Sequence, residues 1–349
     1  GASVAVEKTS PTPHAVTLLD DGLASLAARL DLIRGAQHSI DLEFFIYDLD
    51  FSARWITAEL VERARAGVRV RLLVDFAGPV FALRPEYAGF LQAQGIEVRY
   101  YNTSPLYRFV AVHHRNHRKL LVVDDHAAIV GGRNIADDYF GLSELYNFLD
   151  SDLLVRGEIV RAMRETFDLY WNSHFTRQPE QRPARDFLAD RPGDAERRAR
   201  IEPVAKARLA ASPAGVCRET AFVTDLPGIA AADRRVYPAI TRAMAAARTE
   251  VVGESPYFVL TGEGAELVRN PVERGVRVSV LTNSLHSTDA FYTVAALWLN
   301  LGDVAATGLT MHAFDGRAAP TSPTVPLPET RRGTHAKRAV IDGRAYLIG

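Results

Sequence analysis

HRKLLVVDD at residues 117–125 and HAKRAVIDG at residues 335–343 are two copies of one pattern, H-x-K-x4-D. Successive residues of a strand alternate between its two faces, so the histidine and the lysine of each copy are predicted to share one face. The aspartate five residues beyond the lysine is predicted to mark the turn of a hairpin. Only four of the 41 basic residues are lysines, and two of them, Lys119 and Lys337, stand in this pattern. The repeated pairing predicts a protein built from two similar halves.

The sequence around the two motifs repeats in the same order. In both halves a stretch with helical periodicity precedes an apolar strand, and a second helix ends at a glycine before another strand. ERARAGVRVRLLVD at 62–75 aligns with NPVERGVRVSVLTN at 270–283, with Gly67 and Gly275 in register. Because helices alternate with strands, the predicted fold class is α/β, with two similar lobes that each contain a mixed β-sheet flanked by helices.

The predicted domain limits follow from this repeat and from composition. We expect a first lobe at residues 15–175 and a second lobe at residues 221–349. The segment between them, 176–220, is charged and contains prolines, which is typical of a linker with some helix.

The composition excludes several classes of protein. With 349 residues, a formal net charge of −1 and 47% hydrophobic residues, the chain is neither a disordered tail nor a polybasic nucleic-acid arm. The single cysteine, Cys217, cannot form an internal disulfide, so the fold does not depend on an oxidising compartment. No apolar run approaches the roughly 18 residues that a membrane span requires, so membrane contact is expected to be peripheral or made by residues outside this sequence.

The duplicated motif resembles that of the phospholipase D superfamily, in which it is followed by G-G/S-x-N. In the first copy Asp124 is followed at the family spacing by GGRN at residues 131–134. The longer stretches GGRNIADDYF at 131–140 and LTNSLHSTD at 281–289 look most like the bacterial cardiolipin synthase C branch. The second copy reaches only Gly349, before the small residue, the asparagine and the downstream glutamate of the family, so the second lobe is expected to be truncated at its C-terminus.

Chemistry at a phosphodiester explains the residue types in the motif. Displacement there needs a nucleophile, a proton donor for the leaving oxygen, and positive charge on the non-bridging oxygens. Two imidazoles, with pKa values near 6.5, can take the first two roles near neutral pH. The resemblance implies that His117 forms a phosphohistidine and that His335 acts as acid and then as base. Lys119, Lys337 and Asn134 are expected to hold the phosphate oxygens, so no metal or other cofactor is predicted.

Acidic residues near the motifs divide into two groups. Asp124 and Asp342 lie at the hairpin turns and are predicted to be structural members of the site. The resemblance implies that a carboxylate further along each repeat orients a histidine. Asp150 is the best candidate for that role, and Asp152 is the second.

Two other features have structural and functional interpretations. His113, His114 and His117 have the residue types and spacing of a metal site, but no cysteine and no second-half counterpart support a metal.

Aromatic residues on the strands are predicted to be mostly core, with one or two at the edge of the site: Phe44, Phe45, Tyr257 and Phe258. The three tryptophans lie in helical stretches and are predicted to be core: Trp55, Trp171 and Trp298.

The resemblance implies an enzyme, a phosphatidyltransferase that forms cardiolipin from two phospholipids, with phospholipase D hydrolysis as a side reaction. Its expected partners are phospholipids (phosphatidylglycerol, phosphatidylethanolamine or cardiolipin) at a bacterial membrane, and no nucleic acid. Two alternatives remain open. One is a phosphodiesterase or nuclease of the same superfamily, which the net charge of −1 disfavours because proteins that neutralise many phosphates are usually basic. The other is a catalytically inactive, membrane-associated scaffold, suggested by the incomplete second motif.

Overall fold

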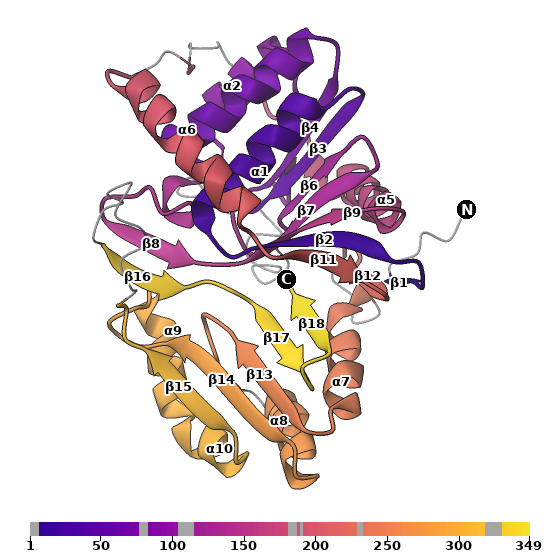
Figure 1. The fold of residues 1–349 in the computed structure, drawn as a ribbon, viewed down its shortest axis with the longest axis vertical. Helices are drawn as coiled ribbons and strands as arrows, with labels where there is room; N and C mark the ends of the chain where they lie inside the picture. The colour runs from indigo at the N-terminus through magenta and orange to yellow at the C-terminus, as the bar shows by residue number, and fades with distance from the viewer. Residues whose placement is uncertain are drawn as a thin grey trace.

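The computed structural model describes residues 7–76, 83–103, 115–180, 187–188, 191–228, 233–260, 262–317 and 330–349. The chain forms two lobes, one above the other in Figure 1, with the first in indigo to magenta and the second in orange to yellow. Each lobe contains a mixed β-sheet with helices packed on it. The predicted α/β class with two lobes is therefore confirmed.

The described residues of the first lobe form a sheet of nine strands. They are β2 (His14–Leu19), β3 (Ser39–Phe44), β4 (Arg69–Asp75), β5 (Glu97–Tyr101), β6 (Leu120–Val123), β7 (Ala127–Gly131), β9 (Asp152–Arg156), β10 (Thr176–Arg177) and β11 (Ala214–Cys217). Their order in the sheet is β10-β5-β4-β3-β6-β7-β9-β2-β11. The helices described in this lobe are α1 (Gly22–Gly35), α2 (Phe51–Arg65), α3 (Pro85–Ala93), α5 (Ile159–Trp171) and α6 (Asp194–Ala210).

The second lobe repeats the central part of that sheet. Its strands are β13 (Glu250–Glu254), β14 (Arg277–Asn283), β15 (Thr310–Phe314), β17 (Arg338–Ile341) and β18 (Ala345–Ile348), and its helices are α7 (Val236–Ala246), α8 (Gly262–Glu273), α9 (Phe291–Leu299) and α10 (Leu301–Ala306). The order β15-β14-β13-β17-β18 matches β5-β4-β3-β6-β7 of the first lobe. In both lobes the first three strands are parallel to one another, and the first strand of the hairpin that follows the motif pairs antiparallel with the central one of the sheet, β3 or β13.

Strand pairing also joins the two lobes. The strand β8 (Tyr146–Leu149) pairs in parallel with β16 (Arg331–Thr334), and Leu149 is the register partner of Thr334. A second small sheet pairs β1 (Glu7–Ser10) with β12 (Thr220–Val223). Because β8 and β16 end together, the residues that follow them, Asp150 and His335, are brought to the same place.

Local sequence explains why the first sheet is rigid. Side chains of Asp21 and Asp50 accept hydrogen bonds from the first turns of α1 and α2, which fixes where these helices begin. The central strands are buried because α1, α2 and α3 cover one face of the sheet and α5 covers the other, where β3 and β4 also carry the buried ion pair of Asp41 and Arg71. The motif hairpin β6–β7 is part of this doubly covered sheet, so the residues that precede it are held on a rigid base.

Two parts of the chain differ from expectation. The segment predicted as a linker contains α6, which packs on α1, and β11, which extends the first sheet beside β2. The domain limits remain a prediction, but most of this segment lies on the first lobe (Figure 1). The prediction that all three tryptophans are core was wrong for Trp298, which is exposed on α9, whereas Trp55 and Trp171 are buried.

Candidate active site

The motif residues lie just before the hairpins instead of on their first strands. His117 and Lys119 precede β6, and His335 and Lys337 precede β17. The prediction that they lie on the strands was therefore wrong by a few residues. Each pair nevertheless lies side by side, since Lys119 Nζ is 3.0 Å from His117 Nδ1 and Lys337 Nζ is 3.3 Å from His335 Nε2.

His335 is docked against the first lobe. Its ring is 4% exposed, and its Nδ1 lies 2.7 Å from the Asp150 carboxylate. The rings of Tyr139 and Phe148 lie with their centroids 5.2 and 5.1 Å from that of the imidazole. Its backbone N–H donates to the carbonyl of Leu149 at 2.7 Å. All four partners belong to the first lobe, so this half of the site exists only where the two lobes meet.

The Asp150 carboxylate is held in place by its surroundings. Arg133, which is buried, donates to the backbone oxygen of Asp150 and pairs with Asp152 at 3.1 Å. A Cβ at Gly132 would overlap the Asp150 carboxylate, so this carboxylate packs closely against the Gly132 backbone. Asp152 also pairs with Arg29 at 3.2 Å and so belongs to the buried scaffold. Burial acts to raise the pKa of Asp150, but the hydrogen bond and charge of His335 lower it, so the carboxyl stays ionised.

His117 has different surroundings. Its side chain is exposed, and the Phe45 ring lies with its centroid 4.4 Å from that of the imidazole. Within the residues that the structure describes, no carboxylate hydrogen-bonds to it. Loss of solvent on its protein-facing side, followed by the charges of Lys119, Lys337 and His335, lowers the pKa of His117. The charges of Lys337 and His335 act on His117, so the two motifs lie near each other.

The two lysines concentrate positive charge in this site. Burial and then the charge of Lys337 lower the pKa of Lys119 well below its usual value. Burial also lowers the pKa of Lys337, while Asp150 acts in the opposite direction. Two lysine ammonium groups repel each other in a partly buried site. An anion that lies between them stabilises both.

Asn134 lies beside the site and is almost fully bonded. Its Oδ1 accepts from the backbone N–H of Ile46 at 3.0 Å, and its Nδ2 donates to the Tyr139 hydroxyl at 2.9 Å. An amide nitrogen carries two hydrogens, and within the described residues one N–H of Asn134 has no acceptor. Asn134 thus also positions Tyr139 against His335.

Asp124 and Asp342 hold the hairpin turns. Both have a positive φ, 51° and 54°, which is the conformation that a tight turn requires. Their carboxylates accept backbone N–H bonds from the segments that lead into β3 and β13: Gln37, His38 and Ser39 in the first lobe, and Arg248, Thr249 and Glu250 in the second. They contact scaffold backbone and lie at the far end of the hairpins from the histidines.

Sequence reasoning missed a pair of glutamates at equivalent positions. Glu43 on β3 is fully buried, accepts a hydrogen bond from Asn116 Nδ2 at 2.5 Å and pairs with Arg118 at 3.3 Å. Glu254 on β13 accepts a hydrogen bond from the Thr334 hydroxyl. Asn116 and Thr334 are the residues immediately before the two motif histidines. The sequence did contain one sign of this role. Glu43 lies within an apolar strand, and a buried carboxylate needs a hydrogen-bonding or charged partner.

A second equivalent pair holds the backbone before each histidine. Asp75, the last residue of β4, accepts from the Asn116 N–H at 2.8 Å and pairs with Arg115 at 3.1 Å. Asn283, the last residue of β14, accepts from the Thr334 N–H at 2.9 Å. Burial raises the pKa of Asp75 to about 6, despite the bonds that it accepts.

The remaining predicted residues are placed as follows. Phe45 and Tyr257 edge the site, since the Tyr257 ring lies 6.3 Å from that of His335, whereas Phe44 is core. His113 and His114, the other members of the alternative metal cluster, lie outside the described residues. In the described ranges no group of three His, Cys, Asp or Glu residues could hold a metal ion.

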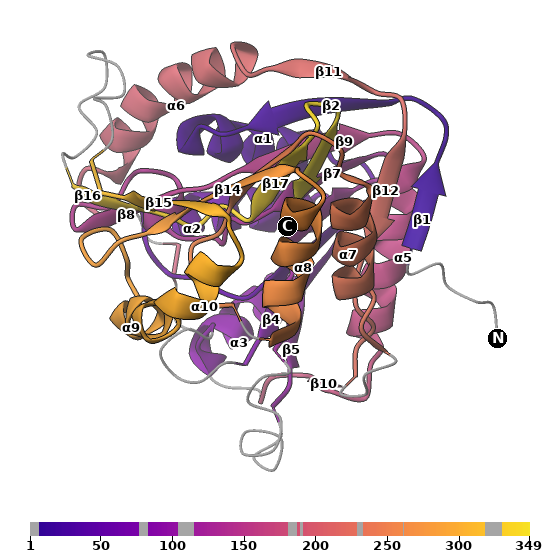
Figure 2. The ribbon, with the colours of Figure 1, turned by 90° about the horizontal axis from the view of Figure 1, so that it is seen from below.

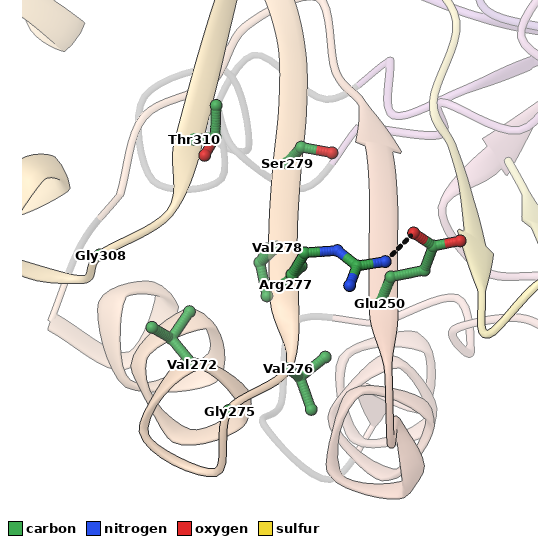
Figure 3. Close-up of a pocket in the computed structure, with 9 residues that line it drawn as sticks. All are labelled: Glu250, Val272, Gly275, Val276, Arg277, Val278, Ser279, Gly308 and Thr310. Atoms are coloured by element: carbon green, nitrogen blue, oxygen red, sulfur yellow. Dashed lines mark hydrogen bonds and ion pairs between the residues drawn. The ribbon is translucent and has the colours of Figure 1, made fainter.

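A separate hollow of about 360 Å³ lies in the second lobe, beside the start of β14 (Figure 3). Arg277 and Glu250 pair across it at 3.0 Å, and it has no histidine in its lining. Glu250 begins β13, whereas Glu254 ends that strand beside the motif. The hollow is therefore at the opposite end of the sheet from His335 and is no part of the site.

The fold and the site define a class: a two-lobed α/β protein in which two H-x-K motifs form one composite site between the lobes. A family model described as cardiolipin synthase, PLD-like domain, matches residues 30–171. The chain belongs to the phospholipase D superfamily.

Similar sequences and one solved structure are as follows. An uncharacterised protein of Helicobacter pylori is 30% identical over 83% of this chain and 63% of its own length. Cardiolipin synthase C of Escherichia coli is 28% identical over 78% of this chain and 63% of its own length. The chain thus spans less than two thirds of the length of these relatives. The fold is similar to that of phosphatidylserine synthase of Haemophilus influenzae, with a TM-score of 0.65 and 15% identity over 94% of this chain and 76% of that one.

Proposed function

We propose that the protein is a phospholipase D-type phosphatidyltransferase of the cardiolipin synthase kind, which joins the phosphatidyl group of one phospholipid to the hydroxyl of another. The observation that carries this proposal is the 2.7 Å contact between Asp150 of the first lobe and His335 of the second, beside Lys119 and Lys337. Relatives named cardiolipin synthase support the lipid class of substrate.

The electrostatics of the site favour a phosphodiester. Burial and the charge of Lys337 lower the pKa of Lys119, and a phosphate between the two lysines would offset both effects. With the remaining N–H of Asn134, they would stabilise the negative charge on the non-bridging oxygens. In this proposal, lysine side chains of the protein itself supply the positive charge that stabilises the phosphate oxygens.

The first step assigns His117 as nucleophile. Its lowered pKa keeps the imidazole neutral, and its exposed ring is accessible to a substrate. Its Nε2 lone pair attacks phosphorus, the N–P bond forms, and the bond from phosphorus to the leaving alcohol breaks. The attacking tautomer carries its proton on Nδ1, so the Lys119 ammonium, 3.0 Å from that atom, would turn towards the phosphate.

The second role falls to His335. Its Nδ1–H is donated to Asp150, which leaves Nε2 to carry the proton that the leaving alkoxide receives. In the second half-reaction His335 Nε2 takes the proton of the incoming hydroxyl, whose oxygen attacks phosphorus as the P–N bond to His117 breaks. Water in place of the lipid hydroxyl would give phospholipase D hydrolysis.

The experiment that tests this proposal is mass spectrometry of lipids. The purified full-length protein is incubated with phosphatidylglycerol, alone and with phosphatidylethanolamine, and His335→Ala serves as the inactive control. We expect cardiolipin to appear only with the active protein. A protein that forms no cardiolipin but cleaves single-stranded DNA would favour the nuclease alternative, and a protein inactive on both would favour the scaffold.

We further propose that the protein works in peripheral contact with a bacterial membrane, because its proposed substrates reside there. None of the helices that the structure describes is both long and apolar enough to cross a bilayer.

A further inference from the structure

α9 carries large apolar side chains on a face that no described residue covers. Phe291 is 73% exposed, Tyr292 65%, Trp298 59% and Leu299 88%. Phe291 and Trp298 are seven residues apart, as are Tyr292 and Leu299, so the four lie on one side of the helix. Figure 2 shows α9 as the outermost helix of the second lobe, at the edge of the molecule.

The opposite side of α9 is apolar as well. Val294 and Leu297 are buried against the lobe. No residue from Ala290 to Gly302 is charged, whereas the exposed faces of α6 and α8 carry many Arg and Glu residues. A helix that is apolar all round is normally covered on both sides, so the exposed face of α9 is a surface for a partner.

Two hydrogen bonds connect the segment before α9 to tyrosines at the edge of the site. The Tyr257 hydroxyl, whose ring edges His335, donates to Asp289 at 2.8 Å, just before α9 begins. On the other side, the Tyr146 hydroxyl of the first lobe donates to the carbonyl of Ser287. Two more exposed leucines adjoin these contacts in the sequence, Leu145 and Leu285. Exposed apolar side chains therefore occur on α9 and next to the segments that carry Tyr146 and Tyr257, the two tyrosines that form the rim of the site.

Positive charge flanks the same rim. Gly316 lies against the backbone of His286 and Ser287, between Asp315 and the exposed Arg317, whose side chains pair at 3.7 Å. The N–H of Arg332 donates to the carbonyl of Gly316, and Arg331 lies over the Tyr146 ring. Aromatic and apolar side chains beside arginines are the combination that binds the interface of a phospholipid bilayer, where rings lie at headgroup level and arginines contact phosphates.

We propose that the exposed face of α9 docks on the surface of a phospholipid bilayer and so brings the site entrance to the lipid headgroups. This inference rests on the proposed lipid function and adds the part of the molecule that contacts the membrane. Trp298 and Leu299 enter the interface, Phe291 and Tyr292 lie nearer the entrance, and Arg317 and Arg331 face the headgroup phosphates.

The fluorescence of Trp298 tests the contact without any need for catalysis. The full-length protein is mixed with vesicles of phosphatidylethanolamine and phosphatidylglycerol that contain brominated phosphatidylcholine, whose bromines quench tryptophan on contact. We expect quenching, most of which is lost in Trp298→Phe and kept in Trp55→Phe, because Trp55 is buried in the first lobe. Equal quenching in both variants, or none in the wild type, would overturn the proposal.

A second arm links docking to turnover. We expect Trp298→Ser with Leu299→Ser to lower activity on vesicles at least tenfold and to leave activity on a soluble short-chain phosphatidylglycerol unchanged. The matched control is Val216→Ser, an exposed apolar residue on β11, which should change neither activity. If sedimentation shows that the double variant converts a dimer to a monomer, or if it loses both activities with its fold intact, α9 covers another protein surface and the proposal fails. Quenching at Trp298 in a wild type inactive on every lipid would refute the proposed function and leave the docking in place.

Discussion

The two motif halves share a scaffold but give their histidines different surroundings. In both, a glutamate and an Asp or Asn at strand ends hold the residue before the histidine, Glu43 and Asp75 in one and Glu254 and Asn283 in the other. His335 is nonetheless buried against a carboxylate, whereas His117 is exposed beside a lysine. The duplicated fold therefore places the two histidines in equivalent positions. The groups that surround each imidazole ring then give the two histidines different chemical roles.

The largest expected effect is the loss of either histidine. His117→Ala and His335→Ala should each lower phosphatidyl transfer by about 10⁴-fold or more, because members of one catalytic set do not act additively. Lys206→Ala, an exposed lysine on α6, is the control and should keep full activity. Turnover within tenfold of wild type in either histidine variant would show that the two halves do not form one site.

Asp150→Asn should have a smaller effect of about 10²- to 10³-fold, because the amide keeps the shape but not the charge that holds the His335 Nδ1–H. Burial lowers the pKa of His335 below its usual value, and the hydrogen bond and charge of Asp150 partly oppose that shift. Without the carboxylate that pKa falls, so the acid form exists only at lower pH and the pH optimum should move down. The pH dependence of kcat with a natural lipid measures this shift, and an optimum that stays in place argues against Asp150 as the partner of the general acid.

Glu43→Gln and Glu254→Gln should each lower a rate about tenfold, but in different half-reactions. The amide still accepts from Asn116 or Thr334 and loses the ion pair to the neighbouring arginine, Arg118 or Arg338. With a nitrophenyl phosphodiester, Glu43→Gln should slow the burst, which reports attack by His117. Glu254→Gln should leave the burst and slow the later steady state, which depends on His335. Identical burst kinetics in the two variants would contradict separate roles.

The smallest effect should come from Asp75→Asn, which copies the residue found in the second half. The folded pKa of Asp75, about 6, lies above its usual value because of burial. Stability from such a group is present at low pH and is lost as pH rises through the folded pKa. The melting temperature of the wild type relative to Asp75→Asn should therefore fall by a few degrees between pH 5 and pH 7.5. The reciprocal variant Asn283→Asp should be more destabilised at pH 7.5 than at pH 5. If the difference in melting temperature between each variant and the wild type does not change with pH, ionisation of this carboxyl is excluded as the cause.

Much of the fold could be predicted because the repeat fixed the order of helices and strands. Gly67 and Gly275 end equivalent helices, and both have the positive φ that favours glycine. The strands β8 and β16 were not predicted, since a short parallel pair between lobes has no local signal. For the same reason, sequence named Asp150 but not the histidine with which it pairs, which lies 185 residues away.

Residue type and periodicity also led to one wrong prediction, that Trp298 is a core residue. Trp298 has the helical periodicity of a core residue but lies on the face of α9 that no described residue covers. Periodicity finds apolar faces and does not distinguish a protein core from another apolar partner. Glu43 and Asp75 were overlooked for a related reason, because single carboxylates at strand ends gain meaning only from the backbone that they contact.

The most direct test of separate roles for the two histidines is to trap the covalent intermediate. A nitrophenyl phosphodiester needs little protonation of its leaving group, so His335→Ala should still form a phosphohistidine and then stall without a base for the acceptor. Acid-labile, base-stable label mapped by mass spectrometry should lie on His117 in that variant, and His117→Ala should carry none. Label on His335 in the His117→Ala protein, with none on His117 in the converse variant, would contradict the account.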